Sequence, residues 1–198
     1  MTEQSKTKGL YSHNQELKKI TVESTMQALI QLMRVERYEE ISITAICERA
    51  GISRNAFYKN FGTKEKVFKE IIEKFIKHLL KELGNPFNSR VSLGWYQNFF
   101  KLIKEESEIL LTLMKASLKD VYLETVNDIL MRNEGLDAET KYKRIMWNGA
   151  IQNIVAVWVE SGMKESIEIM ARICFDKLKY VSNKEFQLPN FLKRKNPQ

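Results

Sequence analysis

One short stretch gathers side chains that donate hydrogen bonds and carry positive charge. Residues 51–64 read GISRNAFYKNFGTK. If they contain a helix, Phe57 and Phe61 lie four residues apart on one face, where their rings can anchor it. Another face then carries Ser53, Arg54, Asn55, Tyr58 and Lys59. Side chains of these types can contact the bases and phosphates of a nucleic acid.

Two short helices joined by a glycine must position these side chains. Ser42 predicts the start of a helix over residues 43–50, and Ser53 the start of a second one. Gly51 can take the left-handed conformation that follows a helix end. Residues suited to a close crossing and a shared core are Ala45, Ala50, Ile46, Ile52, Phe57 and Phe61. We interpret the pair as a helix-turn-helix, whose second helix can enter a DNA major groove.

Helices are expected almost throughout, because 198 residues contain only eight glycines and three prolines. Apolar spacing predicts a first helix from about residue 14 to 35 and a long one over residues 64–83. The segment GNPFNS at residues 84–89 is the clearest boundary. Further helices are predicted from WYQNFFKLI, SEILLTLMKASL, VYLETVNDILMRN, residues 138–161 and a last amphipathic segment ending near residue 181. The predicted fold class is therefore all-α.

Positive charge is concentrated at the two ends of the chain. The net charge is +7, and residues 1–83 hold 15 Lys and Arg against 11 Asp and Glu. Residues 84–183 hold 13 of each, and residues 184–198 hold four against one. A basic N-terminal part next to a neutral larger part is consistent with a polyanionic partner, although ordinary surface solvation gives a similar balance.

Residues 42–68, SITAICERAGISRNAFYKNFGTKEKVF, resemble the DNA-binding signature of the tetracycline-repressor (TetR/AcrR) transcriptional regulators. The matching residues are Ile46, Ala50, Gly51, Ser53, Phe57, Tyr58, Phe61 and Lys64. The resemblance covers about residues 14–83, and AVWVESGMKES at residues 156–166 is similar to the end of the family's penultimate helix. It implies an all-helical homodimer with a DNA-binding N-terminal domain and an inducer-binding C-terminal domain.

On this basis the chain divides into four parts. Residues 1–62 are expected to form a helix-turn-helix DNA-binding domain, which the helix at residues 63–83 connects to the rest. Residues 84–183 are expected to form a ligand-binding and dimerisation domain, and residues 184–198 a basic, disordered tail. We therefore expect a dimeric transcriptional regulator, a repressor released from a palindromic operator by a small-molecule effector. The alternative is a TetR-like coactivator or protein-interaction module that does not itself bind DNA.

The resemblance also assigns operator contacts residue by residue. The DNA-binding residues it implies are Ser42, Thr44, Ser53, Arg54, Asn55, Tyr58, Lys59, Asn60 and Lys64. Tyr58 and Lys64 match positions that commonly contact phosphates, whereas base edges are open to Arg54 and Asn55, which favour guanine and adenine. The chain departs from the family at Thr44, Asn55 and Asn60, where basic, small and histidine residues are frequent, so the base preference stays open.

The predicted C-terminal part contains candidates for a ligand pocket and a dimer face. The ligand-binding candidates are Trp95, Tyr96, Phe99, Phe100, Tyr122, Trp147, Asn148 and Gln152. At helical spacing the rings fit a plain core equally well, and the two amides could instead bond across a dimer seam. The helix at residues 138–161 is apolar nearly all round, so we expect it to pair with its copy through the last two helices. A larger internal core is the alternative.

Other classes of function find little support in the sequence. The two histidines, His13 and His78, and the two cysteines, Cys47 and Cys174, have no metal-site or disulfide spacing. No catalytic or nucleotide-binding motif occurs. We therefore expect no enzyme activity, no cofactor and no metal. The N-terminus does not resemble a secretory signal and no segment is apolar enough for a membrane span, which favours a cytoplasmic protein.

Overall fold

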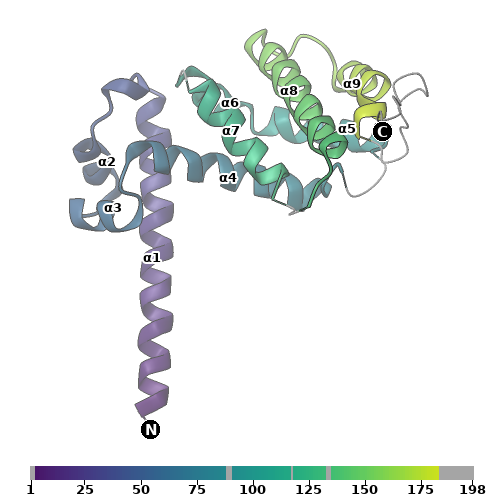
Figure 1. Cartoon of the computed structure of the whole chain (residues 1–198). Helices are drawn as coiled ribbons and strands as arrows, with labels where there is room; N and C mark the ends of the chain where they lie inside the picture. Colours follow the sequence, from purple (N-terminus) through teal and green to yellow (C-terminus); the bar gives the residue numbers. More distant parts are fainter. Residues whose placement is uncertain (1–2, 88–90, 117, 133–134, 183–198) are drawn as a thin grey trace, which may run out of the picture. The chain divides into compact units, whose positions relative to one another are not determined.

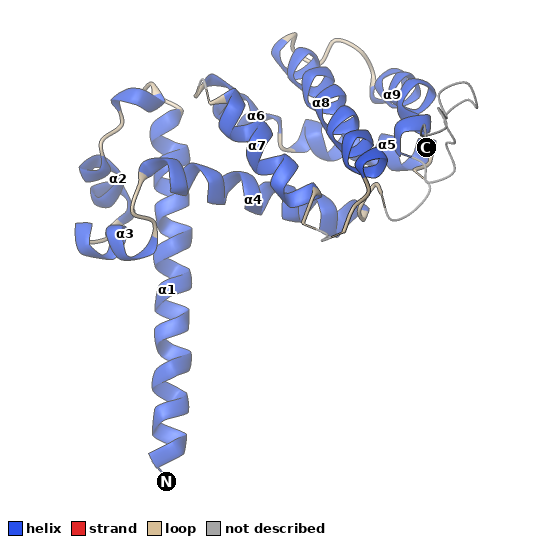
Figure 2. Cartoon of the chain, viewed as in Figure 1, coloured by secondary structure: helices blue, strands red, loops and turns tan. Residues whose placement is uncertain are grey.

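Helices are the only regular elements in the described part of the chain. The structure, a computed structural model, describes residues 3–87, 91–116, 118–132 and 135–182. The helices are α1 (Glu3–Met33), η1 (a single 3-10 turn, Tyr38–Glu40), α2 (Ile43–Ala50), α3 (Arg54–Asn60), α4 (Lys64–Leu83), α5 (Leu93–Glu105), α6 (Ser107–Lys115), α7 (Lys119–Leu130), α8 (Ala138–Glu160) and α9 (Ile167–Ser182) (Figure 1). Loops alone join them (Figure 2), which confirms the all-α prediction for these residues. The predicted basic tail, residues 184–198, lies outside the described residues.

The first helix begins earlier than apolar spacing indicates. The predicted start near residue 14 was wrong, because α1 is already helical at Glu3. Its second half faces a core, where Met26, Leu29 and Met33 are buried, but every residue over 14–20 is exposed. The spacing of core-facing residues marks only the part of a helix that packs, and here the helical backbone continues beyond that part.

The chain folds into two compact units. The first comprises residues 1–76 and 108–125, and the second comprises residues 77–107 and 126–198, each in so far as it is described. This grouping differs from the predicted division at residue 84, because α6 and the first half of α7 belong with the N-terminal helices. Two ion pairs inside the first unit, Arg34–Glu108 (3.2 Å) and Lys69–Glu124 (3.6 Å), are consistent with this grouping. The functional division at residue 84 stays a prediction.

The first unit is built around apolar side chains of α1 and α4. Val67, Phe68 and Ile72 of α4 are fully buried, as is Leu29 of α1. Tyr38 of η1 contacts Phe68 edge to face, with ring centroids 5.6 Å apart. The segment between α1 and α2 is thus held against α4.

In the second unit, α9 packs against both α5 and α8. The buried rings of Tyr96, Phe100 and Trp158 form much of the core. Trp158 Nε1 also donates to the Glu165 carbonyl (3.0 Å), which fixes the turn between α8 and α9. The core of this unit is therefore largely aromatic.

One side of α8 is covered and another is exposed. Trp147, Ile151 and Val155 are buried, whereas Met146 and Val157 are more than half exposed. Within the described residues, a single copy of the chain therefore leaves part of this apolar helix exposed. None of the described helices combines the length and apolar character that crossing a membrane requires.

Candidate nucleic-acid interface

Hydroxyl caps and a left-handed glycine set the limits of α2 and α3. Ser42 Oγ accepts the N–H of Ala45 (3.0 Å), and Ser53 Oγ accepts the N–H of Ala56 (3.1 Å). Gly51 ends α2 with φ of 67°, a conformation that a side chain would strain. The limits predicted for α2 and the start predicted for α3 are confirmed.

Apolar residues anchor α3 from within the first unit. Ile46 and Phe57 are fully buried, and Phe61 is nearly so, with its ring centroid 5.8 Å from that of Phe57. Both α2 and α3 also pack against α1. Cys47 is buried too, and burial raises the pKa of its thiol, as expected of a residue that packs as a small hydrophobe. The predicted ring anchors are confirmed.

The outer face of α3 presents hydrogen-bond donors to solvent. Arg54, Asn55, Tyr58 and Lys59 are all exposed. Arg54 Nη2 lies 3.5 Å from Tyr58 Oη, and its guanidinium carbon is 6.0 Å from the centre of that ring. This contact raises the pKa of Arg54. Two side chains suited to base and phosphate contacts are therefore already adjacent.

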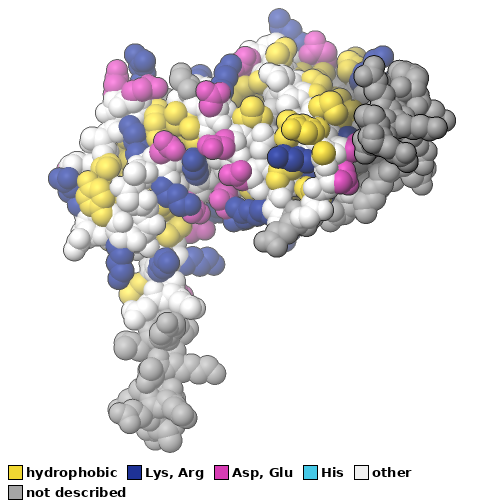
Figure 3. Space-filling view, viewed as in Figure 1, with side chains coloured by type: hydrophobic (Ala, Val, Ile, Leu, Met, Phe, Trp, Pro, Cys, Tyr) yellow, Lys and Arg dark blue, Asp and Glu magenta, His cyan; other side chains and the backbone are white. Residues whose placement is uncertain are grey.

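Positive charge accumulates along this segment without any acidic residue. Residues 49–64 contain Arg49, Arg54, Lys59 and Lys64, at intervals of five, and no Asp or Glu. Figure 3 shows Lys and Arg side chains over the visible face of the region around α2 and α3. Arg49, exposed in the last turn of α2, was missed in the sequence analysis, although this regular spacing could have indicated it. A patch of one sign attracts a polyanion.

The three hydroxyl residues assigned to operator contacts are exposed near the starts of α2 and α3. Ser42 and Ser53 each accept one backbone N–H, and each keeps its own O–H to donate to a phosphate oxygen. Thr44 lies on the first turn of α2. The structure therefore brings all three to helix N-termini, where anions are favoured.

Asn60 has its side chain engaged within α3. Its Nδ2 donates to the Ala56 carbonyl (2.8 Å), and the residue is half-buried. One amide hydrogen thus satisfies a carbonyl near the end of the helix, which leaves this residue less available for DNA than the side chains of the outer face.

The side chain of Lys64, for which the sequence predicts a phosphate contact, is bound to backbone carbonyls of the protein itself. Its ammonium donates to the carbonyls of Tyr38 (2.5 Å) and Ile41 (2.7 Å), with Glu39 O at 3.4 Å, and lies 4.3 Å from the centre of the Tyr38 ring. Burial lowers the pKa of Lys64, and the charge of Glu39 opposes that shift. Since an ammonium has three donors, this geometry argues against a direct phosphate contact.

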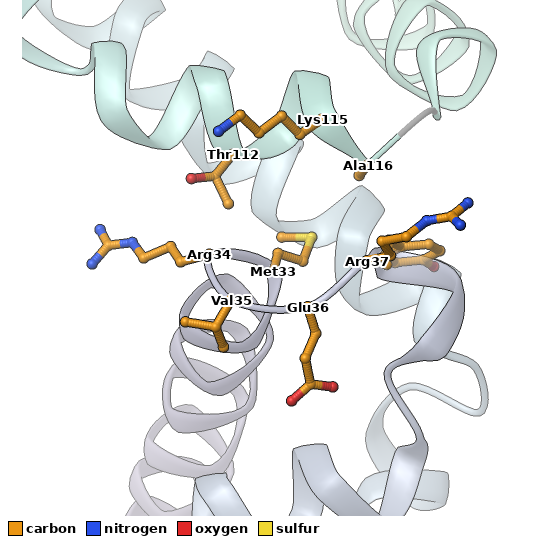
Figure 4. A pocket seen from close by; sticks show the side chains of 9 residues that line it. Met33, Arg34, Val35, Glu36, Arg37, Thr112, Lys115 and Ala116 are labelled. Carbon is orange, nitrogen blue, oxygen red and sulfur yellow. The ribbon is translucent and has the colours of Figure 1, made fainter.

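A shallow cavity of about 240 Å³ lies at the end of α1. Its lining residues are Met33, Arg34, Val35, Glu36, Arg37, Tyr38, Thr112, Lys115 and Ala116 (Figure 4). The charged ends of Arg34, Glu36 and Arg37 point in different directions rather than toward one centre. The cavity contains none of the predicted ligand residues, and its side chains do not converge on a ligand.

Five of the predicted ligand-binding rings form one cluster in the second unit. Trp95 stacks on Phe99 (5.4 Å between centroids) and meets Tyr96 and Trp147 edge to face. Phe99 likewise contacts Phe100. Trp147 Nε1 donates to Tyr96 Oη at 3.0 Å. Except for half-buried Trp95 these rings are buried, so they serve at least as core.

The remaining ligand candidates, Asn148, Gln152 and Tyr122, do not all lie in the same unit. Asn148 is buried and its Nδ2 donates to Asn127 Oδ1 (2.7 Å), while Gln152 Nε2 donates to Asn148 Oδ1 (2.8 Å). Tyr122 belongs to the first unit, where burial raises its pKa to about 12. The ring cluster and the two amides thus share a unit that does not include Tyr122.

Comparison with known proteins adds one finding about the N-terminal helices. Residues 26–71 match the family model described as bacterial regulatory proteins, tetR family. The match begins within α1, includes α2 and α3, and ends within α4, so it contains the whole outer face described above. No curated protein matches the chain. The helix-turn-helix is therefore the DNA-binding domain of a family of transcription regulators.

Proposed function

We propose, from the premise that this chain belongs to the tetR family of bacterial regulatory proteins, that it is a homodimeric repressor. It would bind a palindromic operator and leave it when a small-molecule effector binds. The observation that carries the proposal is the outer face of α3, where Arg54, Asn55 and Lys59 are exposed while two buried rings hold the helix from behind.

Contacts with the operator would divide by chemistry. Arg54 and Asn55 start α3 and can each form a bidentate pair with a base, worth about 1–3 kcal/mol of discrimination against the wrong base. Tyr58, Lys59 and the serine hydroxyls would contact phosphates and fix the register of the helix. Lys64 is not among these contacts, because its ammonium is already satisfied by backbone carbonyls.

An exposed apolar patch on α8 and α9 supports the homodimer. Its members are each 47–67% exposed: Tyr142, Met146, Val157, Ile169 and Ile173. Figure 3 shows hydrophobic side chains gathered over the region of α8. A self-complementary apolar face is what a two-fold dimer buries, and two copies of α3 could then read half-sites about 34–36 Å apart.

The release step is supported by bonds at the two ends of α4. Lys64, its first residue, donates to the loop before α2, and Leu83, its last, accepts from Trp95 Nε1 (2.9 Å) in the aromatic cluster. An effector that altered the cluster would thus act on the same helix that holds the loop before α2. The effector needs only to bind the released state more tightly, by about 1–3 kcal/mol.

Operator binding tests the proposal directly. Fluorescence anisotropy with DNA from upstream of the chain's own gene should give specific binding, weakened at least tenfold by Arg54→Ala with Asn55→Ala. Lys101→Ala, an exposed change in α5, is the matched control and should bind as the wild type does. Equal binding of the double variant would refute the role of α3, and no DNA binding at any sequence would favour the protein-interaction alternative.

A further inference from the structure

A buried arginine of the second unit has no negative partner among the residues that the structure describes. Arg144 of α8 is 6% exposed. Its Nη1 donates to the carbonyl of Leu130 (2.5 Å), and its guanidinium carbon lies 5.1 Å from the centre of the Phe87 ring. Its Nε is buried without any hydrogen-bond partner, and no carboxylate of the described residues forms an ion pair with it.

These contacts leave most of the charge of Arg144 uncompensated. Leu130 is the last residue of α7, so its carbonyl carries only part of the roughly half charge of a helix C-terminus. The face of a ring adds a weak attraction. A buried guanidinium without an anion is costly, since arginine does not lose its proton in proteins. The bond to the C-terminal end of α7 thus explains the position of Nη1. It explains neither why Nε has no hydrogen-bond partner nor why no negative charge of the described residues lies beside the guanidinium.

Polar residues continue from Arg144 along the same face of α8. Asn148 and Gln152 follow at steps of four residues, and Asn127 of α7 joins them through its bond with Asn148. Asn127 and Gln152 are half-buried, so the row is partly exposed at that end. Amide N–H groups that these bonds do not use remain available to an acceptor.

Aromatic rings also lie next to the guanidinium. The Phe87 ring that faces Arg144 also contacts Trp147 edge to face (5.3 Å), and Trp147 contacts Trp95. A ligand that reached the guanidinium would therefore have flat apolar neighbours for its body and amide donors for its polar atoms.

We propose that Arg144 is the anion-binding group of the effector site and that the effector is a small aromatic carboxylic acid. Its carboxylate would pair with the Nε edge of Arg144 and supply the missing charge, and its ring would pack among Phe87 and Trp147. The regulatory meaning of this site rests on the proposed function, but binding of the acid does not.

The test compares acids with their neutral amides on the full-length protein without DNA. Benzoate, salicylate and indole-3-acetate are titrated by calorimetry beside benzamide, salicylamide and indole-3-acetamide. At least one acid should bind tenfold or more tightly than its amide. Equal affinity of acid and amide, or no binding of any of the three acids, would overturn the proposal.

Variants then show whether the preference for an acid over its amide depends on Arg144. Arg144→Met should abolish the difference between acid and amide, Arg144→Lys should keep part of it, and Lys101→Met, an exposed cation of α5, should keep all of it. An undiminished preference in Arg144→Met would overturn the proposal. If Arg144→Met does not fold, the acid–amide comparison in the wild type and in Arg144→Lys decides.

Operator binding is measured separately, so the two proposals can fail independently. Acid binding through Arg144 without any DNA binding would refute the repressor and leave the acid site standing. Operator binding by a protein that binds none of the acids in calorimetry would refute the acid site and leave the repressor standing. Release of the operator by an acid in the wild type, but not in Arg144→Lys at the same concentration, would support both.

Discussion

Lys59 and Lys64 lie five residues apart in the chain, but their ammonium groups have different surroundings. Lys59 is exposed on α3, and within the described residues its side chain makes no hydrogen bond or ion pair. Lys64 donates to the loop between α1 and α2 and lies over the Tyr38 ring. We expect the charge of Lys59 to release counterions from DNA, whereas that of Lys64 stabilises the domain that presents α3.

Salt dependence separates these two roles. Lys59→Gln should reduce the slope of log affinity against log salt by about 1 for each DNA phosphate that the lysine neutralises in the wild type. Lys64→Gln should weaken operator binding and lower the urea midpoint without changing that slope. Anisotropy titrations at several salt concentrations measure both. A reduced slope in Lys64→Gln would restore the direct phosphate contact that the sequence predicted.

Tyr38 is one of the buried phenols on which stability at alkaline pH depends. Burial, helped by the charges of Glu65 and Glu39, raises the pKa of Tyr38 to about 12, above the value of about 10 of an unfolded tyrosine. Its contribution to stability is therefore complete below about pH 10 and declines as the pH rises toward 12. Tyr38→Phe should lose less stability than the wild type between pH 9 and 11, as measured by urea unfolding. An equal loss in the two proteins would contradict the raised pKa.

At the scale of elements, α2 and α3 depend on a turn that only glycine fits without strain. Gly51→Ala should cost about 1–2 kcal/mol, because a Cβ there meets no atom within 4 Å and the whole penalty is the left-handed backbone. Gly94→Ala is the control, since Gly94 lies inside α5 without positive φ. That change should be neutral or stabilising by up to about 1 kcal/mol in urea unfolding. Similar costs at both positions would refute the explanation.

Elements with local signals could be predicted from the sequence, and elements without them could not. The limits of α2 and α3 followed from serines and a glycine within a few residues of each helix end. The start of α1 did not, because its first turns carry no packing pattern and no cap that the sequence announces. The exposed face of α3 was also predictable, since residues four apart share a face.

The parts of the site that could not be predicted depend on distant partners. The carbonyls that bind Lys64 lie 23–26 residues away in the chain, so helical spacing gives no hint of them. Arg144 was missed for a similar reason: a charged residue on a long helix is normally exposed, and its partner Leu130 lies 14 residues away. Only the folded arrangement shows that these two cations are withdrawn from solvent.

For the whole molecule, the patch on α8 and α9 makes association with a second copy the central expectation. Val157→Glu should weaken dimerisation by about 3–5 kcal/mol, because each copy would bury an unpaired carboxylate. Light scattering after size exclusion should then give the mass of one chain, and operator affinity should fall with it. Lys101→Glu, outside the patch, should remain dimeric. A dimeric Val157→Glu protein would place the interface elsewhere.

The way α3 is held has a consequence for how such a regulator can change its target. Within the described residues, the side chains of Asn55 and Lys59 contact no other group by hydrogen bond or ion pair, while Ile46, Phe57 and Phe61 fix the helix from behind. New recognition residues could therefore be introduced on the front without any repacking behind them. A library randomised at positions 54, 55 and 59 should yield mostly folded variants with new operator preferences, so this domain is a good starting point for engineered gene switches.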